Sequence, residues 1–230
     1  MQPGYFITGT DTGIGKTIVS TLLIQHFIAQ GEKVIGMKPI ASGAQIVDGR
    51  LQNEDARALL TASNVAVSYE LINPYCFAPA IAPHIAAAKS QTIISFAHIL
   101  DCYAQLSAQA ERIIIEGVGG WRVPLDDQHD VADLALQFNV PVILVVGMRL
   151  GCLNHAVLSA EAILAKGCNL IGWVANCVDP EMPAFEDNLA SLRLRITRPL
   201  LAVIPHLNID KSIPVTEVAW SLDDTKNRHA

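Results

Sequence analysis

Residues 9–17 read Gly-Thr-Asp-Thr-Gly-Ile-Gly-Lys-Thr, a glycine-rich turn that follows a short apolar run and precedes a long segment with helical apolar spacing. Glycines allow backbone N–H groups to approach phosphate oxygens, and the following helix brings the positive end of its dipole to the same place. The lysine of such a turn reaches the outer phosphates, and the hydroxyl of the next threonine can bind Mg²⁺. The strict motif has glycine six residues before the lysine, where this chain has Thr10, with Gly9 one position earlier. The stretch predicts a phosphate-binding loop, because the motif requires this strand and this helix around it; a purely structural glycine turn is the alternative.

Length and composition favour one large α/β domain. The chain has 230 residues, of which 51% are hydrophobic, which suffices for a full core. We expect the domain to span residues 1–222 and the polar residues 223–230 to fray. The net charge of −6, without a long basic cluster, argues against a nucleic-acid partner held by phosphate contacts.

Cysteine usage and the lengths of the apolar runs bear on the compartment. The five cysteines are scattered and form no C-x-x-C pair, which favours reduced thiols over disulfides. No apolar run reaches membrane-spanning length, and the start of the chain has neither a charged leader region nor a cleavage site. We therefore expect a cytoplasmic protein with no membrane partner.

Apolar runs with strand character alternate with segments of helical spacing. The predicted strands are 5–8, 34–37, 112–116, 141–146, 170–175 and 200–204, and the predicted helices are about 16–30, 53–62, 92–109, 130–138, 152–166 and 184–196. Continuous apolar strands are typical of a parallel sheet covered on both faces, so the pattern predicts a doubly wound, mostly parallel α/β fold of the phosphate-loop type. In such folds ligands bind beyond the carboxyl ends of the strands. The proline- and alanine-rich segment 64–91 is predicted to be a long connection that serves the site.

Polar residues follow several predicted strands. Lys38 and Ser42 come after the second strand, Asp55 lies in the first turn of a predicted helix that Asn53 can cap, and Glu116 ends the third strand. Hard cations prefer carboxylate oxygens, so the position of Glu116 beside the phosphate loop predicts that its carboxylate binds Mg²⁺ or a water molecule. The alternatives are a solvated surface charge for Lys38 and a solvated strand end for Glu116.

Two later strand ends also suggest ligand contacts. Residues 151–154 begin a predicted helix whose free N–H groups can hold a carboxylate or phosphate, with an ordinary strand-to-helix turn as the alternative. Asn176 can read the edge of adenine through its planar amide, or serve only as a turn former. No pair of histidines has zinc-ligand spacing, so we expect no zinc site.

Taken together in chain order, these segments resemble the dethiobiotin synthase family. The matching segments are residues 9–17, Lys-Pro-Ile-Ala-Ser-Gly at 38–43, Asn-Pro-Tyr-Cys-Phe at 73–77, Pro-His-Ile-Ala at 83–86, Glu-Gly-Val-Gly-Gly-Trp at 116–121, Leu-Gly-Cys-Leu-Asn-His-Ala at 150–156 and Gly-Trp-Val-Ala-Asn at 172–176. The family's loop has the same displaced glycine. The chain departs from the family at Ala82, where serine is frequent, so a hydroxyl role at that position is lost.

The resemblance implies an ATP-dependent ligase of biotin biosynthesis that is a homodimer. Its substrates would be 7,8-diaminopelargonic acid, CO₂ or bicarbonate, and ATP with Mg²⁺; a carbamate and a carbamic-phosphoric anhydride would be intermediates. The residues implied are Thr12, Lys16 and Lys38 for catalysis; Gly13, Ile14, Gly15, Lys16, Thr17, Ile18, Asp55, Glu116, Gly117, Val118, Gly119, Asn176, Cys177, Pro205, His206 and Leu207 for the nucleotide; Thr17, Asp55 and Glu116 for the metal; Ser42, Gly151, Cys152, Leu153 and Asn154 for the substrate. The last four of these would act across the dimer interface.

Two other classes share the phosphate-loop fold. Corrinoid amidases use ATP and glutamine, but they need a glutaminase domain for which this chain has no spare length. ATPase switches that position cargo or partition DNA commonly carry a second lysine early in the loop, where this chain has Asp11. The switch remains the alternative to the enzyme, and it would hydrolyse ATP without a small diamine.

Overall fold

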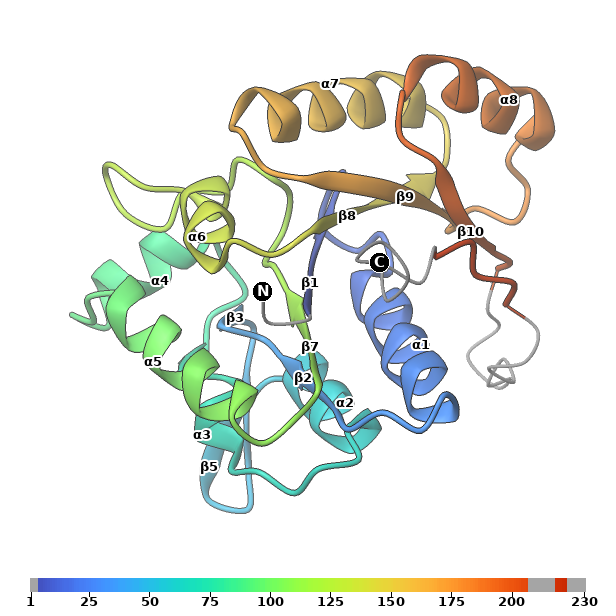
Figure 1. The fold of residues 1–230 in the computed structure, drawn as a ribbon. Helices are drawn as coiled ribbons and strands as arrows, with labels where there is room; N and C mark the ends of the chain where they lie inside the picture. Colours follow the sequence, from blue (N-terminus) through green and yellow to red (C-terminus); the bar gives the residue numbers. More distant parts are fainter. Residues whose placement is uncertain (1–3, 207–217, 223–230) are drawn as a thin grey trace.

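The computed structural model describes residues 4–206 and 218–222, and its centre is one parallel sheet (Figure 1). The sheet has six strands in the order β10-β9-β8-β1-β7-β2. Their bounds are β1 Gly4–Gly9, β2 Val34–Met37, β7 Arg112–Glu116, β8 Val142–Met148, β9 Leu170–Cys177 and β10 Leu200–Ile204. All six predicted strands are confirmed, and every pairing between them is parallel.

Helices cover both faces of the sheet, which explains the continuous apolar strands. Alternate residues of β1 show this, because Ile7 packs into the core beneath α1 and Phe6 into the core on the other face. In Figure 1, α1 and α2 lie on one side of the sheet, and α5, α6 and α7 lie on the other. The bounds of the six predicted helices are α1 Lys16–Ala29, α2 Glu54–Ala62, α5 Phe96–Ser107, α6 Val131–Phe138, α7 Cys152–Ala165 and α8 Phe185–Arg195. The start of α5 is later than predicted because the Ser95 hydroxyl caps it, accepting from the N–H of His98.

The segment 64–91, predicted to be a long connection, is not an irregular loop. This segment contains α3 Tyr69–Ile72, β6 Tyr75–Phe77 and α4 Pro83–Lys89. Three further short strands precede α2: β3 Ile40–Ser42, β4 Gln45–Val47 and β5 Arg50–Gln52. β6 pairs in parallel with β3, whereas β4 and β5 form a hairpin. Strands of three residues are too short to show a period in the sequence, so only their pairing reveals them.

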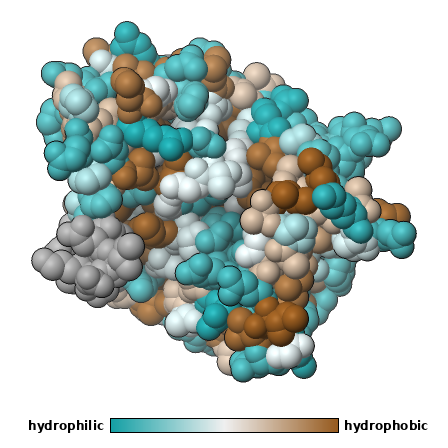
Figure 2. Space-filling model, turned by 180° about the vertical axis from the view of Figure 1, so that it is seen from behind, coloured by the Kyte–Doolittle hydropathy of each residue, from teal (hydrophilic) through white to brown (hydrophobic). Residues whose placement is uncertain are grey.

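The described part of the C-terminal region packs against α1. Val218 and Trp220 join the core on the α1 face, and the N–H of Ser221 donates to the carbonyl oxygen of Leu201 at 2.8 Å. The tail predicted at 223–230 lies outside the described residues. Within residues 4–206 and 218–222, helices are too short or too polar to cross a membrane. On the face shown in Figure 2, hydrophobic residues form separate patches among hydrophilic ones.

Because the sheet is parallel, the carboxyl ends of its strands share one edge. β1 lies between β7 and β8: the chain runs from β1 to the edge strand β2, returns to β7, and then crosses to β8, β9 and β10 on the other side of β1. The loops after β1, β2 and β7 therefore meet at the point where the strand order reverses, which is where ligands bind in such sheets.

Candidate active site

The predicted phosphate loop joins β1 to α1 at this edge. Gly13 and Gly15 have φ angles of 71° and 82°, in the left-handed region that glycine adopts without strain. A Cβ atom at Gly15 would lie only 2.1 Å from the Nδ2 atom of Asn176. Among the described residues no side chain caps the start of α1, so its first N–H groups remain for a ligand. The loop thus has the backbone of an anion-binding turn.

A cavity of about 850 Å³ opens beside this loop. The predicted site residues that line it are Thr12, Gly13, Gly15, Lys16, Thr17, Ile18, Lys38, Ser42, Asp55, Glu116, Val118 and Gly119. The sequence did not predict the other lining residues, which are Ala41, Asn53, Glu54, Ala80, Ile81, Ala82, Pro83 and Val123. Four of these come from segment 64–91, which supports the prediction that this segment contributes to the site.

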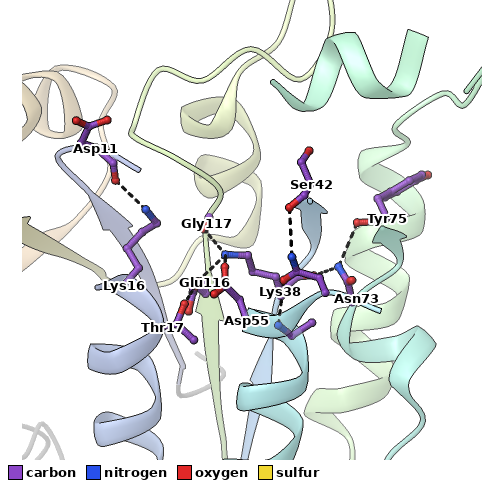
Figure 3. Close-up of polar contacts among 12 residues, drawn as sticks. Asp11, Lys16, Thr17, Lys38, Ser42, Asp55, Asn73, Tyr75, Glu116 and Gly117 are labelled. Atoms are coloured by element: carbon purple, nitrogen blue, oxygen red, sulfur yellow. Dashed lines mark hydrogen bonds and ion pairs between the residues drawn. The ribbon is translucent and has the colours of Figure 1, made fainter. Parts of the chain in front are cut away.

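Lys38 lies at the centre of a cluster of charged side chains from three elements (Figure 3). Its Nζ atom is 3.0 Å from Oδ2 of Asp55 and 2.5 Å from Oε1 of Glu116, and it also donates to the carbonyl oxygen of Gly117 at 3.3 Å. The hydroxyl of Thr17 donates to the same Oε1 atom at 2.9 Å. Residues from the starts of α1 and α2 and the ends of β2 and β7 therefore form one connected network.

Burial and charge pairing act against each other in this cluster. Lys38 is 3% exposed and Glu116 0% exposed. The alternative interpretations, a solvated surface charge for Lys38 and a solvated strand end for Glu116, are therefore wrong. Burial disfavours the charge on Lys38, but Glu116 and Asp55 outweigh it and raise the pKa of Lys38 above its ordinary value. Burial likewise disfavours the charge on Asp55, but Lys38 lowers the pKa of that carboxyl. The structure therefore favours the charged forms of Lys38 and Asp55.

Lys16 lies on the other side of the cavity in a different environment. Its Nζ atom donates to the backbone carbonyl oxygen of Asp11 at 2.9 Å (Figure 3). Burial and the positive charge of Lys38 lower the pKa of Lys16 to about 8. The Asp11 carboxylate accepts from the N–H of Thr12 at 2.7 Å and from Arg149 at 2.6 Å. Asp11 thus ties the phosphate loop to the segment after β8.

The oxygens around Lys38 fit a hard divalent cation. Oε2 of Glu116 is buried and has no hydrogen-bond partner among the described residues, and Oδ2 of Asp55 and Oγ1 of Thr17 lie in the same network. Carboxylate and hydroxyl oxygens beside a phosphate loop are the donors that Mg²⁺ takes together with phosphate oxygens and water. The described residues hold no group of three or more histidine, cysteine, aspartate or glutamate side chains suited to a metal. The donor set therefore suits Mg²⁺ bound together with a nucleotide.

Two asparagines hold the backbone of the site in place. The Nδ2 atom of Asn73 donates to the carbonyl oxygens of Lys38 at 2.7 Å and Tyr75 at 3.1 Å. Asn53 caps α2 and donates to the carbonyl oxygen of Ser42 at 3.2 Å. The sequence indicated Asn53 only as a cap and showed Asn73 only as part of a family motif, because backbone contacts of this kind depend on the fold.

Other predicted residues lie outside this cavity. Gly151 to Asn154 begin α7 at a glycine with a φ angle of 94°, and Asn154 is exposed. Asn176 is buried, and its Nδ2 atom donates to the carbonyl oxygen of Ile14 at 2.8 Å, so it is more than a turn former. His206 lies 3.2 Å from the carbonyl oxygen of Cys177, which places the end of β10 beside that of β9. Leu207 is outside the described residues. The ligand roles of these residues stay predictions.

Comparison with known proteins places the chain in a family. A family model described as an AAA domain matches residues 3–210. An ATP-dependent dethiobiotin synthetase from Janthinobacterium sp. (strain Marseille) is 50% identical over 206 residues, covering 88% of this chain and 87% of that protein. One from Aromatoleum aromaticum is 50% identical over 203 residues, covering 88% and 90%. The chain belongs to the ATP-dependent dethiobiotin synthetase family. This family consists of enzymes, and membership confirms the resemblance found in the sequence motifs.

Solved structures of more distant proteins show the fold alone. The septum site-determining protein MinD from Pyrococcus horikoshii, complexed with Mg-ADP, has a TM-score of 0.53 at 17% identity, covering 89% of this chain and 82% of that one. The cell division protein FtsY from Thermotoga maritima has a TM-score of 0.53 at 13% identity, covering 96% and 65%. These likenesses confirm the predicted α/β fold.

Proposed function

We propose that this chain converts 7,8-diaminopelargonic acid, CO₂ and ATP into dethiobiotin, ADP and phosphate. The observation that carries the proposal is the meeting of Lys16, Lys38 and two carboxylates in one cavity beside a phosphate loop. Family membership supports the choice of reaction, because the relatives at 50% identity are named for it. The cavity of about 850 Å³ is of the size that small-molecule sites have.

The reaction needs charge stabilisation and no covalent protein nucleophile. One amine adds to CO₂ and loses a proton to give a carbamate, whose oxygen attacks the γ-phosphorus of ATP as ADP leaves. The second amine attacks the carbonyl carbon of this mixed anhydride, closes the ring and expels phosphate. Lys16 and Lys38 stabilise the negative charge on the phosphoryl and carbamate oxygens, which is the largest contribution that a preorganised site of this kind makes.

The other residues position the reactants. Backbone N–H groups from Gly13 to Ile18 bind the phosphates at the start of α1. The hydroxyls of Thr12 and Ser42 contact the carbamate or the substrate; Oγ of Ser42 supports this role, because it is buried and has no partner among the described residues. Thr17, Asp55 and Glu116 would hold Mg²⁺, which when bound would neutralise phosphate oxygens during transfer. Asn176 and the neighbouring ends of β9 and β10 would receive the adenine.

We propose further that the enzyme is a homodimer in which the start of α7 binds the substrate carboxylate of the partner subunit. The start of α7 supports this, because it has no side-chain cap among the described residues and does not line the cavity of its own chain. Asn154→Ala should raise the KM for the diamine about tenfold and leave the KM for ATP unchanged. Glu161→Ala, at an exposed position further along α7, is the control and should change neither value. An unchanged diamine KM in Asn154→Ala would remove this part of the proposal.

The decisive test of the reaction is phosphate release from Mg-ATP and bicarbonate, measured with and without diaminopelargonic acid. We expect release that depends on the diamine, together with a product of the mass of dethiobiotin. Release that does not depend on the diamine would overturn the proposal and favour a nucleotide-driven switch.

A further inference from the structure

The Lys38 ammonium has its three donors engaged by the protein itself. An ammonium group has three N–H bonds, and Nζ of Lys38 has three acceptors: Asp55 at 3.0 Å, Glu116 at 2.5 Å and the carbonyl oxygen of Gly117 at 3.3 Å. The side chain is only 4% exposed. In this arrangement no donor of Lys38 is left for a carbamate or phosphate oxygen. Lys38 must therefore give up at least one protein contact before it can act on a substrate.

The acceptors of Lys38 are also the oxygens that suit a divalent cation. Asp55 and Glu116 supply the carboxylates, and the Thr17 hydroxyl is bonded to the Oε1 atom that Lys38 contacts (Figure 3). Mg²⁺ binds oxygens at about 2.0–2.1 Å and repels a neighbouring ammonium, so the two cations compete for these carboxylates. The second oxygen of Glu116 has no partner among the described residues, so the site has an oxygen that Lys38 does not occupy.

The two carboxylates that contact Lys38 differ in how accessible they are to a metal ion that would replace it. The Asp55 side chain is 43% exposed and opens into the cavity, whereas that of Glu116 is fully buried. Without Lys38 the buried Glu116 carboxylate would have to find another positive charge, because an uncompensated buried charge is costly. Lys16 does not provide this charge through a hydrogen bond, since its Nζ atom donates to the carbonyl oxygen of Asp11 on the phosphate loop. Lys38 is thus held by the carboxylates that need a cation, and one of the two contacts is accessible to an entering ion.

We propose that Lys38 is a tethered counter-ion of the metal-binding carboxylates, which a divalent cation displaces, so that the ammonium reaches substrate oxygens only after the metal has bound. This inference rests on the metal ligands assigned in the proposed function. It adds an order of events: Lys38 stabilises Asp55 and Glu116 in the metal-free protein and is released toward the cavity by metal entry. Lys38 is then a catalytic residue whose availability depends on the metal.

Mn²⁺ binding to the nucleotide-free protein tests this without any turnover. Titration calorimetry should give a Mn²⁺ affinity about tenfold or more higher for Lys38→Gln than for wild type, because the competing charge is gone. Lys16→Gln is the matched control, because it removes a positive charge from the same cavity that acts on Asp55 and Glu116 only through space, its Nζ atom donating to the carbonyl oxygen of Asp11. Its Mn²⁺ affinity should stay within about threefold of wild type. Equal or weaker Mn²⁺ binding by Lys38→Gln would overturn the inference.

A second measurement uses the wild-type chain, in case Lys38→Gln does not fold. Reductive methylation followed by peptide mass spectrometry reports how accessible the Lys38 amine is. We expect Mn²⁺ to increase methylation of Lys38 several-fold, with an exposed lysine such as Lys89 as the internal reference. Unchanged methylation of Lys38 at saturating Mn²⁺ would refute the displacement. Absence of Mn²⁺ binding in every protein, even with a non-hydrolysable ATP analogue, would instead remove the metal site of the proposed function.

Discussion

Asn53 offers a sharp test of how the local sequence builds this site. Its side chain accepts from the N–H of Ala56 at 3.3 Å, which caps α2, and donates to the carbonyl oxygen of Ser42 at 3.2 Å. Asn53→Ala removes both bonds and keeps the backbone bond to the Tyr69 hydroxyl. Loss of the cap costs about 1 kcal/mol, and the unpaired Ser42 carbonyl about 1 kcal/mol more. For a chain of 230 residues, a total of about 2 kcal/mol lowers the Tm by about 4–8 °C.

The same substitution should impair the proposed activity, because Asp55 and Ser42 lose their common support. We expect kcat/KM for the diamine to fall about tenfold or more, since small displacements of positioning groups are costly. Thermal unfolding and steady-state phosphate release measure the two effects. Asn53→Asp retains the capping oxygen but not the donor to Ser42, so it should keep most of the stability and lose part of the activity.

Asn64→Ala is the matched control for Asn53→Ala. Asn64 also bonds two backbone groups, accepting from Val34 at 2.8 Å and donating to Glu32 at 2.9 Å, but it does not line the cavity. It should lose comparable stability and keep its kcat/KM once the assay temperature is well below its Tm. If Asn53→Ala keeps its Tm within 1 °C, or if both variants lose the same activity, the reasoning about Asn53 is refuted.

Two further predictions concern the loop and the far side of the sheet. Gly15→Ala should weaken ATP binding at least about tenfold in titration calorimetry, because alanine is strained at a φ of 82° and its Cβ would meet Asn176 at 2.1 Å; affinity within twofold of wild type would contradict this. Asp133, paired with Lys166, has its pKa lowered to about 2 by that ammonium and by the N–H of Asp130. Its stabilising effect is complete above the ordinary carboxyl pKa and is lost as the pH falls through about 2. Urea unfolding should therefore show Asp133→Asn less stable than wild type at pH 7 and closer to it at pH 3; a difference that does not shrink would be evidence against the pairing.

Much of the fold could be predicted because strong local patterns encode it. The six sheet strands are apolar runs that are buried on both faces, and each is found where the sequence placed it. The elements that were missed are the three-residue strands β3 to β6 and the short helices α3 and α4. β3 and β6 pair across a long stretch of chain, as Ile40 does with Tyr75, and β4 and β5 form a hairpin of three-residue strands; local periodicity reports neither pairing.

The residues of the candidate site likewise fall into those that local sequence identifies and those that only the fold brings together. The spacing of Gly15, Lys16 and Thr17 and the position of Glu116 at a strand end identified the phosphate-loop side of the cavity from residue types alone. The sequence predicted that segment 64–91 serves the site and matched Pro83 to a family motif, but it did not show that residues 80–83 form a wall of the cavity, because that depends on how the chain returns after β6. For Lys38, the sequence left open whether it is a surface charge or a site residue.

The sequence by itself determined the parallel sheet, the phosphate loop and the family, because apolar periodicity and short motifs are properties of neighbouring residues. Only the tertiary structure decided that Lys38 is buried between Asp55 and Glu116, which come from positions 17 and 78 residues further along the chain. Its charge state and its competition with a metal follow from that arrangement, since electrostatic interactions in a buried site depend on distance and desolvation and not on sequence separation.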